Sequence, residues 1–158
     1  MPKPKGKDVY KRNISVSGVE FNIEEIYKGI KELAAELGYG FVEKEYEDKP
    51  EQYGHKMGFK FNMSKDIDPL ANFTIEVETA FRKLTKLKTT YIGDCSVKIK
   101  ATLTTDYKNN YGQDKMSIFF FKLYSKVAGG TLKKKYIIPL SKEGGEVYSY
   151  FKKKLDLY

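Results

Sequence analysis

The chain has 158 residues, a hydrophobic share of 41% and a formal net charge of +8. This length fits one domain, and no apolar run is long enough to cross a membrane. The single cysteine and single histidine exclude a disulfide framework, a cysteine zinc cluster and a two-histidine metal site within one chain. We therefore expect a cytoplasmic protein, or a component of a cellular or viral assembly, that holds no cofactor.

Charge is distributed unevenly along the chain. Residues 1–12 carry five Lys or Arg against one acid, residues 20–51 carry ten acids against four lysines, and residues 82–158 carry seventeen Lys or Arg against six acids. This asymmetry favours an anionic partner or self-association through opposite patches, although a lysine-rich solubilising surface has the same composition. Because no linker or repeat divides the chain, we predict a basic flexible tail over residues 1–8 and a single α+β domain over residues 9–158.

A strand is expected over Val9–Ser17, and an amphipathic helix follows it. Asn22 is a residue type that caps helix N-termini, and Glu25 stands at the capping-box position three residues later. Apolar residues then recur at helical spacing as far as Leu37, and Gly38 suits a left-handed C-terminal cap. The pattern predicts a helix from Asn22 to Gly38 with one buried face.

Three segments alternate apolar and polar residues with a period of two: residues 56–63, 73–81 and 95–103. Because successive strand side chains point to opposite faces, each segment has one dry face and one wet face. The residues expected on the dry face are Phe59, Phe61, Phe73, Ile75, Val77, Val97, Ile99 and Leu103. The residues expected to be more exposed are Lys60, Glu76, Glu78, Lys98 and Lys100. If the last two segments pair as a hairpin, the acids of one face the lysines of the other and reduce their free positive charge.

A further strand is expected over Tyr39–Asp48. Alternate residues of a strand share a face, so three acids of this strand are expected on one wet face: Glu43, Glu45 and Glu47. Together the elements predict an α+β fold. Its core is a single antiparallel sheet of about 5–7 strands with helices packed on one face, an order of elements that also allows a helix-grip-like arrangement.

The second half of the chain is less regular. A polar loop is expected over Tyr107–Asp114. Residues 115–127 fit a helix, which we favour, although their aromatic density also fits a buried strand. Thr131–Leu140 is expected to be an extended edge strand, because Pro139 comes late in it. A last helix is predicted over Glu146–Leu157.

The segment Asp94–Tyr107 is followed by Phe121-Lys122-Leu123-Tyr124. It resembles a pattern in small uncharacterised archaeal proteins, in which a strand ends in Asp-Tyr and a Phe-x-x-Leu-Tyr-like helix comes next. The resemblance covers about a third of the chain. It implies a helix at residues 115–127 and no assigned activity. The lysine-rich, tryptophan-free composition is compatible with an archaeal or archaeal-virus source.

Few side chains suit catalysis or metal binding. His55 lies at a loop-to-strand junction, where a solvated imidazole is expected. Cys95 falls on the apolar face of its strand and is expected to be buried. Asp66 and Asp68 have a spacing that could hold a hard cation, but such a pair before a proline is more often a turn. We therefore expect a protein that is not an enzyme.

The leading hypothesis is a non-enzymatic interaction or structural module whose partner is another protein or a second copy. Phe and Tyr, which make up 15% of the residues, are favoured at contact surfaces. The first alternative is sequence-independent binding of nucleic acid, an anionic polymer, because Lys and Arg neutralise phosphates and tyrosines stack on bases. The candidate anion-binding residues are Arg82, Lys83, Lys86, Lys88, Lys133, Lys134 and Lys135.

The second alternative is a carrier of an apolar ligand. A strand, a helix, a run of antiparallel strands and a long final helix resemble the helix-grip arrangement, in which the last helix closes a cavity over the sheet. The residues that would line such a cavity are Met57, Phe59, Phe61, Met63, Phe73, Ile75 and Val77. The same residues would also form an ordinary core, so the sequence leaves open whether they line a cavity or fill a core.

Overall fold

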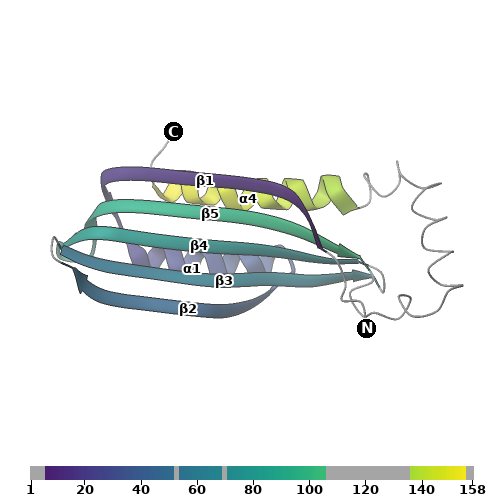
Figure 1. The fold of residues 1–158 in the computed structure, drawn as a ribbon, viewed down its shortest axis with the longest axis horizontal. Helices are drawn as coiled ribbons and strands as arrows, with labels where there is room; N and C mark the ends of the chain where they lie inside the picture. Colours follow the sequence, from purple (N-terminus) through teal and green to yellow (C-terminus); the bar gives the residue numbers. More distant parts are fainter. Residues whose placement is uncertain (1–5, 52–53, 69–70, 106–135, 156–158) are drawn as a thin grey trace, which may run out of the picture.

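The structure, a computed structural model, describes residues 6–51, 54–68, 71–105 and 136–155. In this part of the chain five strands and two helices are formed (Figure 1). Their bounds are β1 Gly6–Phe21, α1 Ile23–Glu36, β2 Gly40–Glu51, β3 Gly54–Asp68, β4 Ala71–Lys86, β5 Tyr91–Thr105 and α4 Ile138–Lys154. The single antiparallel sheet and the helices confirm the predicted α+β class.

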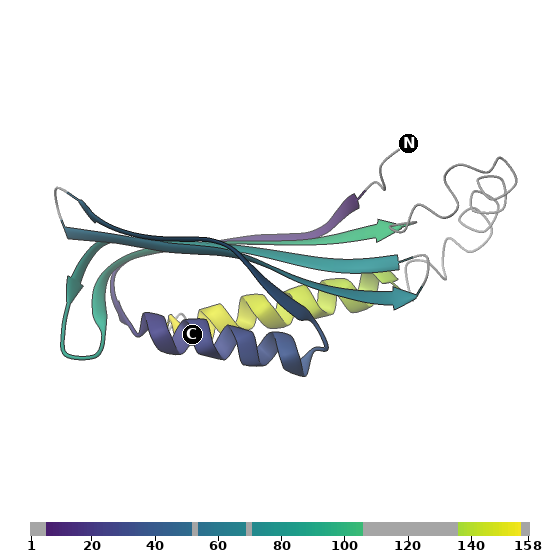
Figure 2. The ribbon, with the colours of Figure 1, turned by 90° about the horizontal axis from the view of Figure 1, so that it is seen from below.

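The sheet has the strand order β1-β5-β4-β3-β2. Strands β2 to β5 follow one another as antiparallel neighbours, whereas β1 pairs with β5 at the opposite edge from β2, and α1 connects the two edges. Both helices lie on one face of the sheet, which we call the inner face (Figure 2). At one end the β4–β5 hairpin curls toward this face and comes level with the start of α1 (Figure 2).

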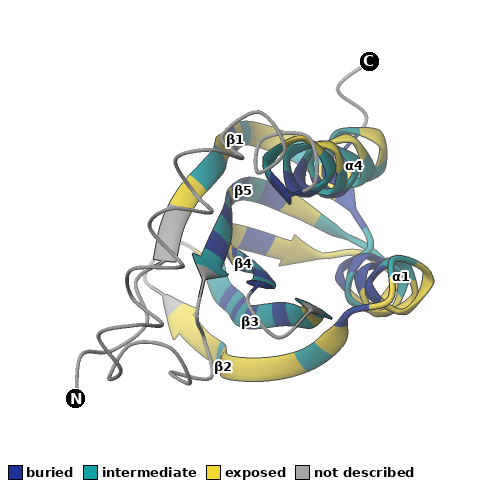
Figure 3. Cartoon of the chain, turned by 90° about the vertical axis from the view of Figure 1, so that its right-hand side faces the viewer, coloured by how far each residue is buried: buried dark blue, intermediate teal, exposed yellow. Residues whose placement is uncertain are grey.

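The sheet is one-sided, as the alternation predicts. All eight residues expected on the dry face are 3% exposed or less. The five residues expected to be more exposed lie on the other face, which we call the outer face, and are half-buried or exposed. Buried residues gather where the helices face the strands (Figure 3). A shift of one residue in the register would reverse every side chain, so this burial pattern fixes the register.

Helix α1 confirms the predicted start and end. The Asn22 side chain accepts a hydrogen bond from the backbone N–H of Glu25, with Oδ1 and N 3.0 Å apart. At the other end, Gly38 has φ +83°, a left-handed conformation that favours glycine. The buried stripe of the helix consists of Ile23, Ile26, Ile30 and Ala34.

Replacing Asn22 by alanine removes the N-terminal cap of α1. We expect this variant to lose about 1 kcal/mol of unfolding free energy, because the N–H of Glu25 loses its partner. Urea denaturation followed by circular dichroism measures the loss. The matched control is Asn13→Ala, at an exposed position in β1, which we expect to change stability by less than about 0.5 kcal/mol. Equal midpoints for the two variants would contradict the cap.

Helix α4 corrects two predictions. Thr131–Leu140 was expected to be an edge strand; its residues 131–135 lie outside the described part of the chain, but residues 138–140 belong to α4, which begins at Ile138 and has Pro139 in its first turn. The last helix was expected to begin at Glu146, eight residues after its actual start at Ile138. In the structure Gly144 and Gly145 both lie inside α4. Proline favours the first turn of a helix because no intrahelical partner exists there for its missing N–H.

The predicted β4–β5 hairpin is confirmed in its register. Glu76 lies opposite Lys100, and Glu78 lies opposite Lys98. Glu76 also bridges two strands, because its carboxylate is 3.6 Å from the Lys100 ammonium and 3.2 Å from the Lys60 ammonium. The hydrogen bond that the Lys60 ammonium donates to the Glu76 carboxylate raises the pKa of Lys60. Lys100 is therefore partly neutralised on the outer face, as expected.

Two further expectations about the first strands are wrong. Strand β1 begins at Gly6, inside the segment 1–8 that was expected to be a tail. In β2 the register shifts between Glu43 and Glu45, so Glu43 pairs with Phe61 on the inner face and Glu45 with Lys60 on the outer face. A bulge of this kind inserts one residue and reverses the alternation beyond it. The three glutamates expected on one wet face are therefore divided between two faces.

Three predictions lie outside the described residues. They are the polar loop Tyr107–Asp114, the helix or strand at residues 115–127, and the candidate anion-binding residues Lys133, Lys134 and Lys135.

Candidate functional site

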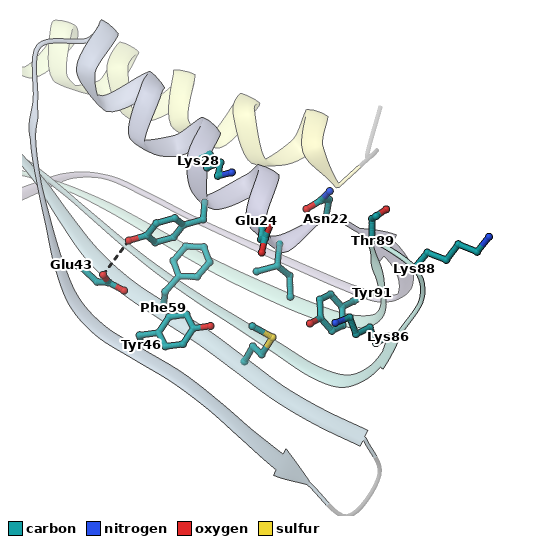
Figure 4. A pocket seen from close by; sticks show the side chains of 13 residues that line it. Asn22, Glu24, Lys28, Glu43, Tyr46, Phe59, Lys86, Lys88, Thr89 and Tyr91 are labelled. Atoms are coloured by element: carbon teal, nitrogen blue, oxygen red, sulfur yellow. Dashed lines mark hydrogen bonds between the residues drawn. The ribbon is translucent and has the colours of Figure 1, made fainter.

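A cleft of about 780 Å³ opens between the first turns of α1, strands β2 and β3, and the β4–β5 hairpin (Figure 4). Its volume lies in the range of roughly 300–1,000 Å³ that is typical of small-molecule sites. The hairpin curls toward the inner face as far as the level of α1. The hairpin, α1 and β2 therefore all line the cleft, with β3 beneath them.

The floor of the cleft is apolar. Met57 and Phe59 reach it from the inner face of β3, and Ile23 reaches it from α1. Beside them Tyr46 of β2 pairs in register with Phe59 and is therefore also on the inner face. Tyr46 is 59% exposed, whereas Phe59 is 3% exposed. The cleft thus presents a large aromatic side chain that no described element covers.

Aromatic contacts hold the wall between α1 and the sheet. The Tyr27 ring of α1 stands edge-on to Phe59, with centroids 5.3 Å apart, and edge-on to Phe41 at 6.1 Å. Edge-to-face pairs of this kind are favourable because the ring edge is positive and the face negative. The position of the Tyr27 hydroxyl is therefore set by the core.

The Tyr27 hydroxyl donates a hydrogen bond to Glu43, with Oη and Oε2 3.1 Å apart (Figure 4). Glu43 can reach Tyr27 because the β2 bulge turns it to the inner face. Partial burial raises the pKa of Tyr27, and this hydrogen bond raises it further. The hydroxyl consequently stays a donor, and Glu43 stays a fixed acceptor at the edge of the cleft.

Tyr46 lies in a negative electrostatic environment. Partial burial raises the pKa of its hydroxyl, and the charges of Asp48, Glu43 and Glu24 raise it as well. Glu24 belongs to the first turn of α1 and lines the same cleft. The β2 side of the cleft therefore combines aromatic rings with carboxylates.

The structure divides the described candidate anion-binding residues between the two faces. Lys86, which pairs in register with Tyr91, lines the cleft. Lys88 of the hairpin lines it too. Arg82 pairs with Asp94 on the outer face, beside Lys56 and Lys98. Lys83 sits at the bulge with φ +52°, its ammonium 4.0 Å from the Asp94 carboxylate. These four cations therefore do not form one patch.

The predicted lining of an apolar cavity is only partly found. Met57 and Phe59 line the cleft, but the other five residues of that set are 2% exposed or less and form the core between sheet and helices. The cleft occupies one end of the inner face, and the ordinary core occupies the rest.

The residues considered for catalysis or metal binding are either bound to other side chains, as are His55 and Asp66, or buried, as is Cys95. His55 Nε2 contacts the Asp48 carboxylate, so the imidazole is half-buried and bound rather than freely solvated. Burial raises the pKa of Cys95 to about 12, which keeps the thiol protonated at neutral pH. Asp66 accepts a hydrogen bond from the Asn72 amide at 2.9 Å. Within the described ranges, no group of three or more His, Cys, Asp or Glu could hold a metal ion.

Sequence reasoning did not select the residues that shape this cleft, chiefly Tyr27, Tyr46, Tyr91, Glu24 and Glu43. The available signal was Tyr46 itself, since it is the one uncharged residue within the run from Glu43 to Lys49. Comparisons with protein-family models, with curated proteins and with solved structures found no significant match. Among the described helices, neither combines the length and the apolar character needed to cross a membrane.

Proposed function

We propose that this chain is a non-enzymatic binding module that holds an apolar small molecule in the cleft between α1 and the sheet. The observation that supports the proposal is the exposed Tyr46 ring beside the apolar floor of Met57 and Phe59. A ligand that covers the Tyr46 ring removes apolar surface from water, which is favourable, whereas Met57 and Phe59 are already buried. A concave, mainly apolar site with a few fixed polar groups is typical of small-molecule binding.

The order of elements supports the same proposal. A strand, a helix, four antiparallel strands and a long last helix follow one another, and β1 lies beside the last strand of the sheet, which resembles the helix-grip arrangement. This chain differs from the helix-grip arrangement in which of its helices lies at the cleft. Helix α4 packs against β1 and β5, whereas α1 forms the wall of the cleft. We therefore assign ligand binding to α1, β2 and β3.

The proposal is tested with decanol as a neutral apolar probe in titration calorimetry. We expect saturable binding to the full chain. The Tyr46→Ser variant should bind about ten-fold more weakly, because the aromatic contact is lost while the exposed position carries little packing. Mass spectrometry of an organic extract of the purified protein adds a second readout, since a carried ligand would co-purify.

The matched control is Val42→Ser. Val42 is 53% exposed on the same strand, but it pairs with Asn62 on the outer face, away from the cleft. We expect this variant to bind decanol like the unmodified chain. Absence of saturable binding, or an equal loss in both variants, would contradict the proposed function.

The other hypotheses from the sequence stay predictions. A protein partner or self-association is favoured by the exposed apolar side chains Leu87 and Ile92 beside the hairpin. Sequence-independent nucleic-acid binding has less support, because the described cations lie on two faces. The cytoplasmic location and the archaeal resemblance are likewise predictions.

A further inference from the structure

We propose that the ligand of this cleft is a cation, an apolar molecule with an ammonium group, and that Glu43 and Tyr46 bind that group. This inference rests on the proposed binding function and specifies the chemical class of the ligand. Three features of the cleft support it: a fixed carboxylate, an exposed aromatic ring beside it, and a β2 wall that contributes no lysine to the lining.

Glu43 is the polar group of the cleft whose position is best fixed. Its carboxylate accepts a hydrogen bond from Tyr27, and the Tyr27 ring is held in turn by edge-on contacts with Phe59 of the core and with the partly buried Phe41. A charge that is already positioned needs little ordering when a ligand arrives, which favours binding. The ligand group that complements a fixed carboxylate is a cation.

Aromatic rings surround the same end of the cleft. Tyr27 of α1 contacts Phe59 of β3, which pairs in register with Tyr46 of β2. The Tyr27 ring already attracts a cation, since the Lys31 ammonium lies 5.4 Å from its centroid, whereas the Tyr46 ring is exposed. The face of an aromatic ring attracts cations, and quaternary ammonium groups are commonly bound between several rings. Partial burial raises the pKa of Tyr46, and the nearby charges of Asp48, Glu43 and Glu24 raise it further.

The lysines that line the cleft come from the hairpin and from α1, and none comes from β2. Lys86 lies beside Tyr91 at the hairpin, and Lys88 extends away from the other lining side chains (Figure 4). The third lysine, Lys28, comes from α1, where Glu24 also lines the cleft, so the α1 wall carries charges of both signs. The β2 wall contributes Glu43 and Tyr46 and no lysine, and it is therefore the acidic, aromatic side of the cleft.

The experiment compares three probes with the same apolar chain: decyltrimethylammonium, decanol and decanoate, each below its micelle concentration. Titration calorimetry on the full chain should give about five-fold tighter binding for the ammonium than for decanol, and the weakest binding for decanoate. In Glu43→Gln the amide oxygen can still accept from Tyr27. We expect this variant to reduce the preference for the ammonium over decanol to about two-fold or less, because the ammonium loses its counter-charge.

The matched control is Glu45→Gln, which removes the same charge two residues away but on the outer face. This variant should keep the full preference for the ammonium. Binding of decanol without that preference, or the same effect of both glutamine variants, would overturn the inference while leaving the binding function intact. If none of the three probes binds, the proposed function itself fails.

Discussion

Replacing Gly144 by alanine should lower the free energy of unfolding by about 1–2 kcal/mol, whereas the same change at Gly145 should raise it by up to about 1 kcal/mol. Both glycines lie inside α4, where alanine is the better helix former. At Gly144, however, a Cβ atom would lie 2.9 Å from Cδ1 and 3.1 Å from Cγ of the Tyr10 ring. At Gly145 the nearest such atom is the Tyr10 hydroxyl, at 3.9 Å. The neighbouring residue is therefore a matched control.

The cause can be isolated with Tyr10→Ala. In that background the ring of β1 is absent, so Gly144→Ala should become stabilising like Gly145→Ala. Urea denaturation of the four combinations of Tyr10 and Gly144 gives the coupling free energy, which we expect to exceed about 1 kcal/mol. A Gly144→Ala variant that is more stable than the unmodified chain would contradict the close approach of α4 to the Tyr10 ring of β1.

These glycines also explain why the start of α4 was not predicted. In the local sequence, a pair of glycines is typical of a helix end. Nothing in the neighbouring residues indicates that the Tyr10 ring of β1 occupies the place where a side chain at Gly144 would lie. A signal was nevertheless present, because Leu140, Val147 and Phe151 recur at helical spacing and are fully or almost fully buried. The strands and α1 were predictable because their side-chain periods and the Asn22 cap depend only on neighbouring residues.

The candidate cleft could be predicted only in part for a similar reason. Met57 and Phe59 were selected from the alternation of β3, which depends on local sequence. Glu43 was placed on the wrong face because a bulge inserts one residue without a distinctive sequence. The meeting of α1, β2 and the hairpin is set by the curl of the sheet, which the strand pattern does not encode.

Replacing Lys65 by methionine should cost about 2–3 kcal/mol of unfolding free energy. The Lys65 ammonium lies 2.8 Å from the Glu143 carboxylate of α4 and 2.9 Å from the carbonyl oxygen of Leu37 at the end of α1. It also lies 4.5 Å from the centre of the Tyr39 ring. The two charged side chains are only about one-fifth exposed, at 20% and 19%. Methionine keeps the apolar stem but leaves Glu143 without its partner.

The control for this loss is Lys60→Met, which removes an ion pair of similar length on the outer face. Lys60 and Glu76 are 3.2 Å apart and about one-third exposed, so the expected cost is below about 1 kcal/mol. A second test is the double variant Lys65→Met with Glu143→Met. Because an unpaired buried charge costs more than a buried apolar pair, the double variant should recover most of the stability that Lys65→Met loses. Recovery would show that the loss comes from the uncompensated Glu143 carboxylate. A double variant no more stable than Lys65→Met alone would instead assign the loss to the Leu37 carbonyl and the Tyr39 ring, which Lys65 also contacts.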